Sequence, residues 1–256
     1  MPSLSTARGQ IGFAERGSGD VPTVFLHGVG SDKTVWNPQL AHFSRTGRAV
    51  AFDYPGYGES EPAPDGTTRD DYAAAVLAAM DELAISSAHI CGLSLGGVIA
   101  IAMHALAGER CASLILADTF AAHPDGRAIY ERSVAGSQNL RAMAEARVDV
   151  LLAQPSDPDV RMEVVDTMAK IDPAAYRIGA EAVWLAEQRE RAEAITVPTL
   201  FLCGAEDTIT PPSLSHELVE MIPGARYAEI GGAGHISNLE RAGEFNRIVA
   251  EFIGNG

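Results

Sequence analysis

The sequence Gly-Leu-Ser-Leu-Gly at residues 92–96 constrains the fold more than any other part of the chain, because of what lies on either side of it. Residues 88–91 form a short apolar run typical of a strand, and residues 97–103 have the composition of a buried helix. We therefore expect Ser94 to lie on a sharp strand-to-helix turn, where the flanking glycines allow close packing. The helix would direct its free N–H groups and the positive end of its dipole at an oxyanion formed there.

Apolar runs typical of buried strands alternate with helical segments along the rest of the chain. This alternation predicts an α/β fold with a mostly parallel sheet of approximately eight strands and helices on both faces. The predicted strands are 11–15, 23–26, 49–52, 88–91, 114–117, 199–203 and 227–230, and the predicted helices of this layer are 70–83, 97–103, 213–221 and 239–253.

One connection is much longer than the others. The stretch from 118 to 198 separates two predicted strands and is helical in pattern, although an ordinary crossover needs only one helix and two short loops. We interpret residues 121–193 as a helical cap (lid) inserted into a core, built around the sheet, that residues 1–120 and 194–256 form.

Composition excludes several classes of function. The formal net charge is −15 and the sequence has no basic patch or stripe, which argues against a nucleic-acid partner. We expect a soluble, cytoplasmic protein, because the sequence has no signal peptide, no apolar run of membrane-spanning length and three scattered cysteines. No metal-ligand spacing, dinucleotide fingerprint or phosphate loop is present, so we expect neither a metal nor a cofactor. The oligomeric state is left open.

The order of a serine, an acidic residue and a histidine along the chain predicts nucleophilic catalysis. A serine hydroxyl needs a base and the base needs an orienting acid, and with the serine on such a turn the expected chain order is Ser, acid, His. His235 follows the strand that ends at residue 230 and Asp207 follows the strand that ends at residue 203, so both should emerge at the sheet edge that presents Ser94. Glu206 and Asp118 are alternatives to Asp207 as the acid.

An oxyanion needs two backbone donors. The N–H of Leu95, directly after the serine, is one candidate. The second is the N–H of Val29, in the glycine-rich bend His-Gly-Val-Gly at residues 27–30 that follows a buried strand. We expect His27 itself to support this loop through hydrogen bonds rather than to act as a base.

These motifs together resemble the α/β-hydrolase superfamily over essentially the whole chain. The matching segments are 27–30, 53–60 (D-x-x-G-x-G-x-S), 92–97, 204–207 and 234–235. Within the superfamily, segments 27–40 and 114–119 are most similar to the 3-oxoadipate enol-lactonase and carboxylesterase group. The resemblance implies an enzyme that hydrolyses a small carboxylic ester or lactone through an acyl-enzyme.

Other activities are open to the same residues. A cofactor-free perhydrolase of the haloperoxidase type, or a C–C bond hydrolase of ring-cleavage products, would use the same triad, and a non-catalytic hydrolase-fold binding protein would retain the pocket alone. An enol-lactone carries carboxylates, for which Lys33, Arg127 and Arg177 are basic candidates, although we expect all three to be solvated surface charges. The candidates for contact with substrate are Gly28, Trp36, Tyr130 and Trp184.

Overall fold

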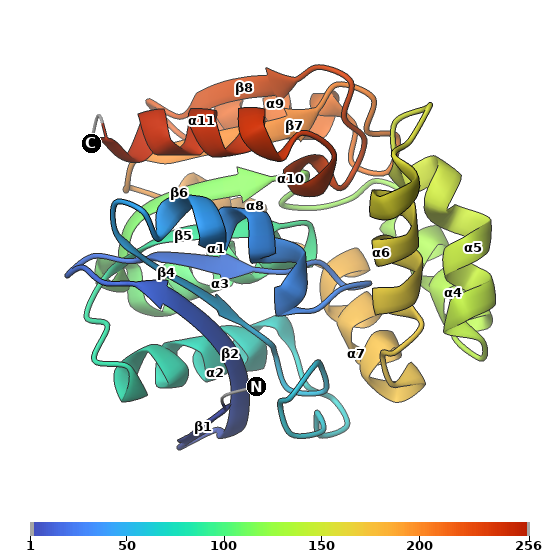
Figure 1. The fold of residues 1–256 in the computed structure, drawn as a ribbon, viewed down its shortest axis with the longest axis horizontal. Coiled ribbons are helices and arrows are strands. Elements are labelled where there is room, and N and C mark those ends of the chain that lie inside the picture. Colours follow the sequence, from blue (N-terminus) through green and yellow to red (C-terminus); the bar gives the residue numbers. More distant parts are fainter. Residues whose placement is uncertain (1–2, 255–256) are drawn as a thin grey trace.

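A single sheet of eight strands forms the centre of the computed structural model, which describes residues 3–254 (Figure 1). The strand order is β1-β2-β4-β3-β5-β6-β7-β8; β1 and β2 pair antiparallel, β2 is antiparallel to β4, and the remaining pairs are parallel. The predicted mostly parallel sheet is therefore confirmed. The strands are β1 (Ser3–Thr6), β2 (Gly9–Gly17), β3 (Thr23–Leu26), β4 (Arg48–Phe52), β5 (Ala88–Leu93), β6 (Cys111–Ala117), β7 (Thr199–Gly204) and β8 (Arg226–Ile230).

The structure differs from the predicted elements at two places. Strand β1 was not predicted, because its four residues, Ser-Leu-Ser-Thr, carry little apolar signal of their own; β1 pairs with the longer β2. The single helix expected over 239–253 is divided into α10 (Ser237–Glu240) and α11 (Ala242–Gly254), because Arg241 between them leaves the helical conformation (φ −132°, ψ 47°).

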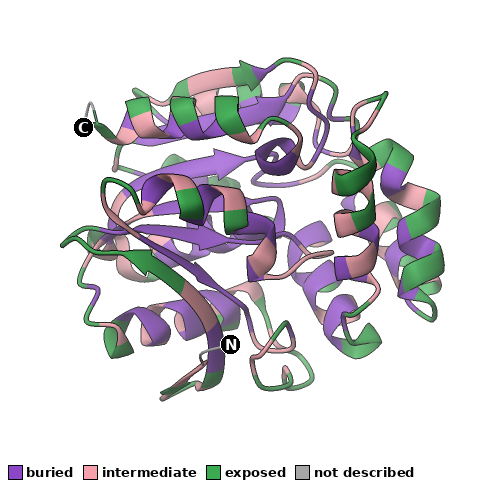
Figure 2. Cartoon of the chain, in the orientation of Figure 1, coloured by how far each residue is buried: buried purple, intermediate pink, exposed green. Residues whose placement is uncertain are grey.

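The two faces of the sheet bury alternate residues of each strand. In β3, Val24 and Leu26 belong to one apolar cluster and Phe25 to the other, as the two-residue period of a strand requires. Figure 2 shows buried strands between helices whose outward sides are exposed. One face is covered by α1 (Asn37–Phe43), α10 (Ser237–Glu240) and α11 (Ala242–Gly254), and the other by α2 (Arg69–Glu82), α3 (Leu95–Ala107) and α9 (Pro212–Met221).

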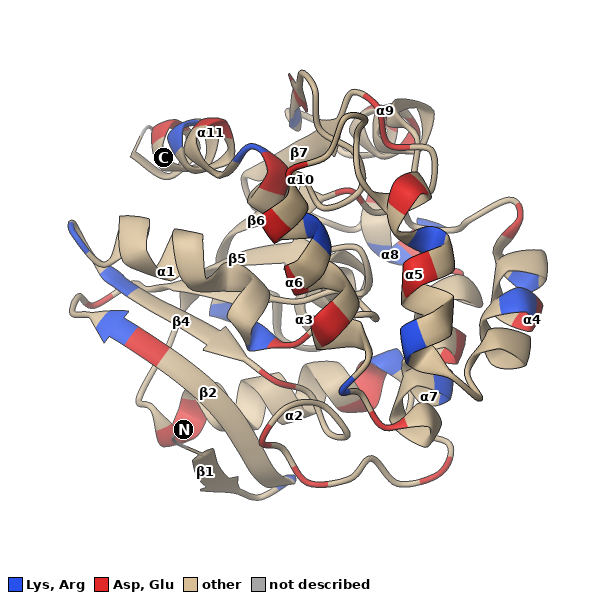
Figure 3. Cartoon of the chain, turned by 45° about the vertical axis from the view of Figure 1, so that its right-hand side comes forward, with Lys and Arg blue, Asp and Glu red and all other residues tan. Residues whose placement is uncertain are grey.

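Five helices lie between β6 and β7 and are called the inserted helices below. Four of them stand beside one another at one end of the sheet, at the right in Figure 1, whereas α8 packs against α3 and α9. Lys and Arg are interspersed with Asp and Glu along α4, α5 and α6 (Figure 3). The inserted helices are α4 (Gly126–Gly136), α5 (Leu140–Leu151), α6 (Pro158–Met168), α7 (Pro173–Trp184) and α8 (Arg189–Glu193).

The strand order places a topological switch at β3. From β3 the chain moves outward to β4 and then returns to β5 on the opposite side of β3. Loops that leave the two strands beside such a reversal diverge, and they leave a crevice at the carboxyl edge of the sheet where ligands bind. The loop after β3 (27–30) and the turn after β5 (Ser94) border this crevice. Within residues 3–254 no helix is both long enough and apolar enough to cross a membrane.

Candidate active site

Ser94 occupies the turn between β5 and α3 in a conformation that side chains rarely adopt. Its φ is 54° and its ψ is −114°, a strained combination for a residue other than glycine. The surrounding backbone holds it there: the Ser94 N–H donates to the carbonyl oxygen of Ala117 at 2.9 Å, and the hydroxyl of Thr119 donates to the Ser94 carbonyl oxygen at 2.8 Å. The turn therefore presents the side chain of Ser94 in a fixed position.

Two glycines allow this turn to pack. A Cβ atom added to Gly92 would collide with the carbonyl oxygen of Gly96, and one added to Gly96 would collide with the carbonyl oxygen of Leu26 in β3. The clashing atoms belong to the backbone and cannot move aside as a side chain could. The Gly-x-Ser-x-Gly spacing is thus required by the close approach of β5, α3 and β3.

The structure brings Ser94, His235 and Asp207 together from three separate parts of the chain. The Nε2 of His235 lies 3.1 Å from the Oγ of Ser94, and its Nδ1 lies 2.8 Å from the Oδ2 of Asp207. Because a carboxylate only accepts, Nδ1 carries the proton and Nε2 is free to accept the serine hydroxyl. All three side chains are buried, which strengthens their electrostatic interactions.

Asp207 is held as a carboxylate by four hydrogen bonds. Besides His235, it accepts from the backbone N–H groups of Ile209 (2.8 Å) and Thr210 (3.0 Å) and from the Thr210 hydroxyl (2.6 Å). Burial opposes its ionised form, but His235 and the hydrogen bonds outweigh burial and leave the pKa of Asp207 below its ordinary value. Burial likewise opposes the charged form of His235, yet the Asp207 carboxylate raises the pKa of His235 above its ordinary value.

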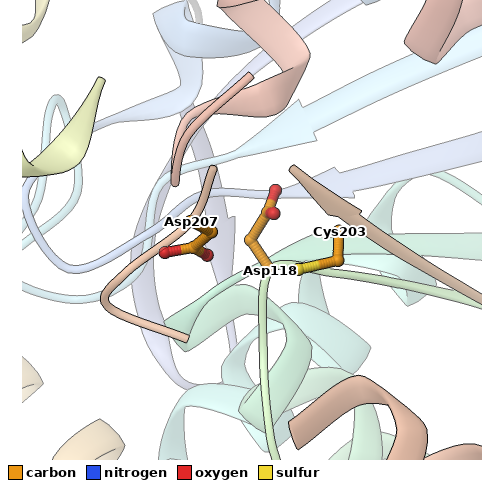
Figure 4. A group of neighbouring side chains, drawn as sticks. All are labelled: Asp118, Cys203 and Asp207. Carbon is orange, nitrogen blue, oxygen red and sulfur yellow. The ribbon is translucent and has the colours of Figure 1, made fainter. Parts of the chain in front are cut away.

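Asp118, the alternative acid, lies beside Asp207 (Figure 4), but its hydrogen bonds go to residues other than the histidine. Its carboxyl group accepts from the N–H of Gly204 at 2.8 Å and from the hydroxyl of Ser237. Burial, followed by the charge of Asp207, raises the pKa of Asp118 to about 8. The other alternative, Glu206, has an exposed side chain.

The two N–H groups expected to bind the oxyanion are free of hydrogen bonds to the described part of the protein. Neither the N–H of Val29 nor that of Leu95 donates to a protein acceptor within residues 3–254. The loop that carries Val29 is fixed by the Nδ1–H of His27, which donates to the carbonyl oxygen of Gly28 at 2.8 Å, and by the hydroxyl of Tyr54, which donates to the carbonyl oxygen of His27 at 3.0 Å. His27 therefore supports the loop, and burial lowers its pKa.

A mostly apolar cavity opens above Ser94 and His235. The core contributes residues of the loop after β3, among them Gly28 and Val29, together with Leu93 and residues near Asp207 and His235, and the remaining wall comes from α5, α6 and α7. The inserted helices thus cover the carboxyl edge of the sheet at this point. They contribute Arg147, Leu151, Glu163, Val164, Thr167, Met168, Tyr176 and Trp184 to the lining.

Residues 23–248 match the Alpha/beta hydrolase family. The chain belongs to this family. A 3-oxoadipate enol-lactonase of Acinetobacter baylyi is 27% identical over 90% of this chain and 87% of its own length. A putative non-heme bromoperoxidase, BpoC, of Mycobacterium tuberculosis is 28% identical over 95% of this chain and 97% of its own. The crystal structure of the enol-lactonase from Burkholderia xenovorans LB400 superposes with a TM-score of 0.92 at 29% identity, over 99% of this chain and all of that one.

Two of the four residues predicted to contact substrate line the cavity of this hydrolase. Gly28 and Trp184 do so, and Trp184 also stacks on Phe120 with ring centroids 5.7 Å apart. Trp36 is instead fully buried in the apolar cluster between the sheet and helices α1 and α11, where it packs against Phe25 and Phe245. Tyr130, on α4, packs at the edge of the apolar core and is not among the lining residues.

None of the three basic residues considered from the sequence reaches the cavity. Arg127 is exposed, and Arg177 hydrogen-bonds Ser137. Lys33 was expected on the surface but is buried, where its Nζ pairs with Asp53 at 2.6 Å and with Glu59. This buried ion pair anchors the loop after β4, so Lys33 has a structural role and is not a solvated surface charge.

The hydrolase carries a basic residue in the cavity that sequence reasoning missed. Arg147, on α5, lines the cavity with one Nη 3.4 Å from the hydroxyl of Tyr176, and it pairs with no carboxylate within residues 3–254. Its charge acts on His235, whose pKa it lowers slightly against the effect of Asp207. Glu163 lines the same cavity, and burial raises its pKa. No motif marks either residue.

Proposed function

We propose that this hydrolase cleaves a small carboxylic ester or lactone through an acyl-enzyme. The observation that carries the proposal is the continuous hydrogen-bonded series Ser94–His235–Asp207 at the wall of an apolar cavity. A nucleophile, a base and an orienting acid in this geometry perform acyl transfer on several unrelated folds.

The steps follow from the positions of the donors and acceptors. Ser94 Oγ attacks the carbonyl carbon while His235 Nε2 takes its proton, and the N–H groups of Val29 and Leu95 stabilise the oxyanion. The imidazolium, stabilised by Asp207, then protonates the departing alkoxide. Water attacks the acyl-enzyme with His235 as base, which releases the carboxylic acid and restores Ser94. In this scheme residues 121–193 act as a cap that keeps bulk water from the reaction.

The substrate we propose carries a carboxylate in addition to the bond that is cleaved. Arg147 supports this, because it is a guanidinium without an acidic partner at the wall of the cavity, and such a group can bind a carboxylate through charge-assisted hydrogen bonds. The similarity to proteins named as 3-oxoadipate enol-lactonases also supports it. Half-esters of dicarboxylic acids and lactones with a free carboxylate are the corresponding classes.

Labelling with a fluorophosphonate tests the chemistry directly. We expect the wild-type protein to be labelled on Ser94 and to hydrolyse esters, and Ser94→Ala to be neither labelled nor active while unfolding at the same temperature. An active Ser94→Ala variant, within about tenfold of wild type, would refute the proposal, because loss of the nucleophile should cost far more.

A second candidate is a perhydrolase, which the likeness to the putative bromoperoxidase favours. Here hydrogen peroxide would replace water in attacking the acyl-enzyme, giving a peracid that oxidises halide in solution. Halide oxidation that requires acetate, peroxide and Ser94, and that is faster than ester hydrolysis, would favour this function over the first.

A further inference from the structure

The loop that carries His235 is fastened to the end of an inserted helix by backbone hydrogen bonds. The N–H of His235 donates to the carbonyl oxygen of Leu151, the last residue of α5, at 2.8 Å. The two segments also touch at Gly234, where an added Cβ would lie 2.7 Å from that same carbonyl oxygen and 2.8 Å from the nitrogen of Ala153. The base and the wall of the cavity are therefore in direct backbone contact.

One carboxylate joins the same two segments a second time. Glu240, the last residue of α10, accepts from the N–H of Gly234 at 2.9 Å and from the N–H of Ala153 at 2.9 Å. Gly234 directly precedes the base, and Ala153 lies two residues beyond α5. Within residues 3–254 Glu240 forms no ion pair, and its carboxylate is bound by these two N–H groups.

Partial burial of Glu240 disfavours its ionised form, an effect that an exposed carboxylate would not experience. Burial raises the pKa of Glu240, and the two N–H donors, helped by the charge of Arg241, oppose that shift. Glu240 is therefore a half-buried carboxylate that binds N–H groups from two separate segments at once.

We propose that Glu240 is a positioning residue, which aligns His235 with Ser94 by tying the base loop to the segment that leaves α5. The inserted helices and the base then move as one unit, so that displacement of α5 from the cavity also withdraws the base. This inference rests on the proposed function, since it assigns Glu240 a role through His235.

Two readouts test it on the whole chain. The first is hydrogen exchange at the amides of Gly234 and Ala153, and the second is the rate at which a fluorophosphonate labels Ser94. In Glu240→Ala we expect both amides to exchange at least about tenfold faster. We expect the labelling rate and kcat for a small neutral ester to fall about 10- to 100-fold, with KM changed less. A displacement of the base by about 1 Å lowers the rate of the chemical step by this order.

Two further variants separate positioning from general stability. Glu240→Gln keeps one acceptor oxygen and should rescue part of the labelling rate; it also carries the test if Glu240→Ala does not fold. Glu244→Gln changes an exposed side chain of the neighbouring helix α11 and should match wild type in both readouts.

The proposal is overturned if folded Glu240 variants label Ser94 within about twofold of wild type, or if only one of the two amides gains exchange. A wild-type protein that is not labelled at all would contradict the proposed function instead, and the exchange measurement would still decide whether Glu240 joins the two segments.

Discussion

Asp118 and Asp207 bury two carboxyl groups with oxygens within 4.8 Å of each other (Figure 4), and only Asp207 hydrogen-bonds His235. The oxygens of Asp118 instead accept hydrogen bonds from the N–H of Gly204, directly before the acid loop, and from the hydroxyl of Ser237, two residues after the base. Burial, followed by the charge of Asp207, raises the pKa of Asp118 to about 8, whereas the contact with His235 keeps the pKa of Asp207 below its ordinary value. The two residues should therefore differ sharply in what their removal costs.

Asp207→Asn should lower kcat about 10³- to 10⁴-fold, because an amide in this place no longer stabilises the imidazolium and can select the wrong tautomer. Asp118→Asn retains an acceptor for the N–H of Gly204 and should cost less than about tenfold. Steady-state kinetics on a neutral ester, with melting temperatures for both variants, would measure the contrast. Equal losses would make Asp118 a partner in the acid function.

The pH dependence of kcat/KM should follow His235. The base must be neutral to accept the proton of Ser94, and its pKa is raised, so activity should increase with pH with a midpoint above about 6.5. In Asp207→Asn the main raising influence is gone and burial remains, so the midpoint should move down. A neutral ester keeps substrate ionisation out of the profile, and a flat response between about pH 5 and 8 would argue against a histidine base.

Arg147→Met should lower kcat/KM for a half-ester of a dicarboxylic acid about 10- to 100-fold, because the substrate carboxylate loses a charge-assisted partner. For the matching neutral diester the change should be small. Arg177→Met, which alters an arginine outside the cavity on the adjacent helix α7, is the matched control. If both esters are affected equally, Arg147 serves the shape of the cavity and not the recognition of charge.

Lys33→Met should destabilise the protein by about 3–5 kcal/mol, since it leaves the buried carboxylate of Asp53 without its cation. Urea unfolding would measure this, with Lys170→Met, at an exposed position, as the control. A loss below about 1 kcal/mol would place the pair among the weak surface-type interactions.

The parts of the fold that the sequence predicts are those with a local physical cause. Strands buried on both faces must be continuous apolar runs, and Gly92 and Gly96 are required by backbone contacts at one turn, so these features can be recognised without the structure. Strand β1 has no such cause, because its polar residues form a strand only by pairing with β2.

The candidate site divides in the same way. Ser94, Asp207 and His235 were placed at one edge because each follows a parallel strand, and the structure brings them together there. Arg147 could not be placed, because the face that α5 turns toward the cavity depends on how the inserted helices dock. Trp36 was predicted to contact substrate but lies in the core. An aromatic residue ten positions after β3 can equally line a pocket or fill the core, and its residue type does not distinguish the two.

The different positions of the two tryptophans give the hydrolase an intrinsic optical reporter. Trp36 is enclosed by Phe25 and Phe245 within the core, where a ligand would not reach it, whereas Trp184 lines the cavity. Any change in indole emission on titration with a ligand should therefore originate from Trp184, and Trp184→Phe should abolish the signal while the emission of Trp36 remains as an internal standard.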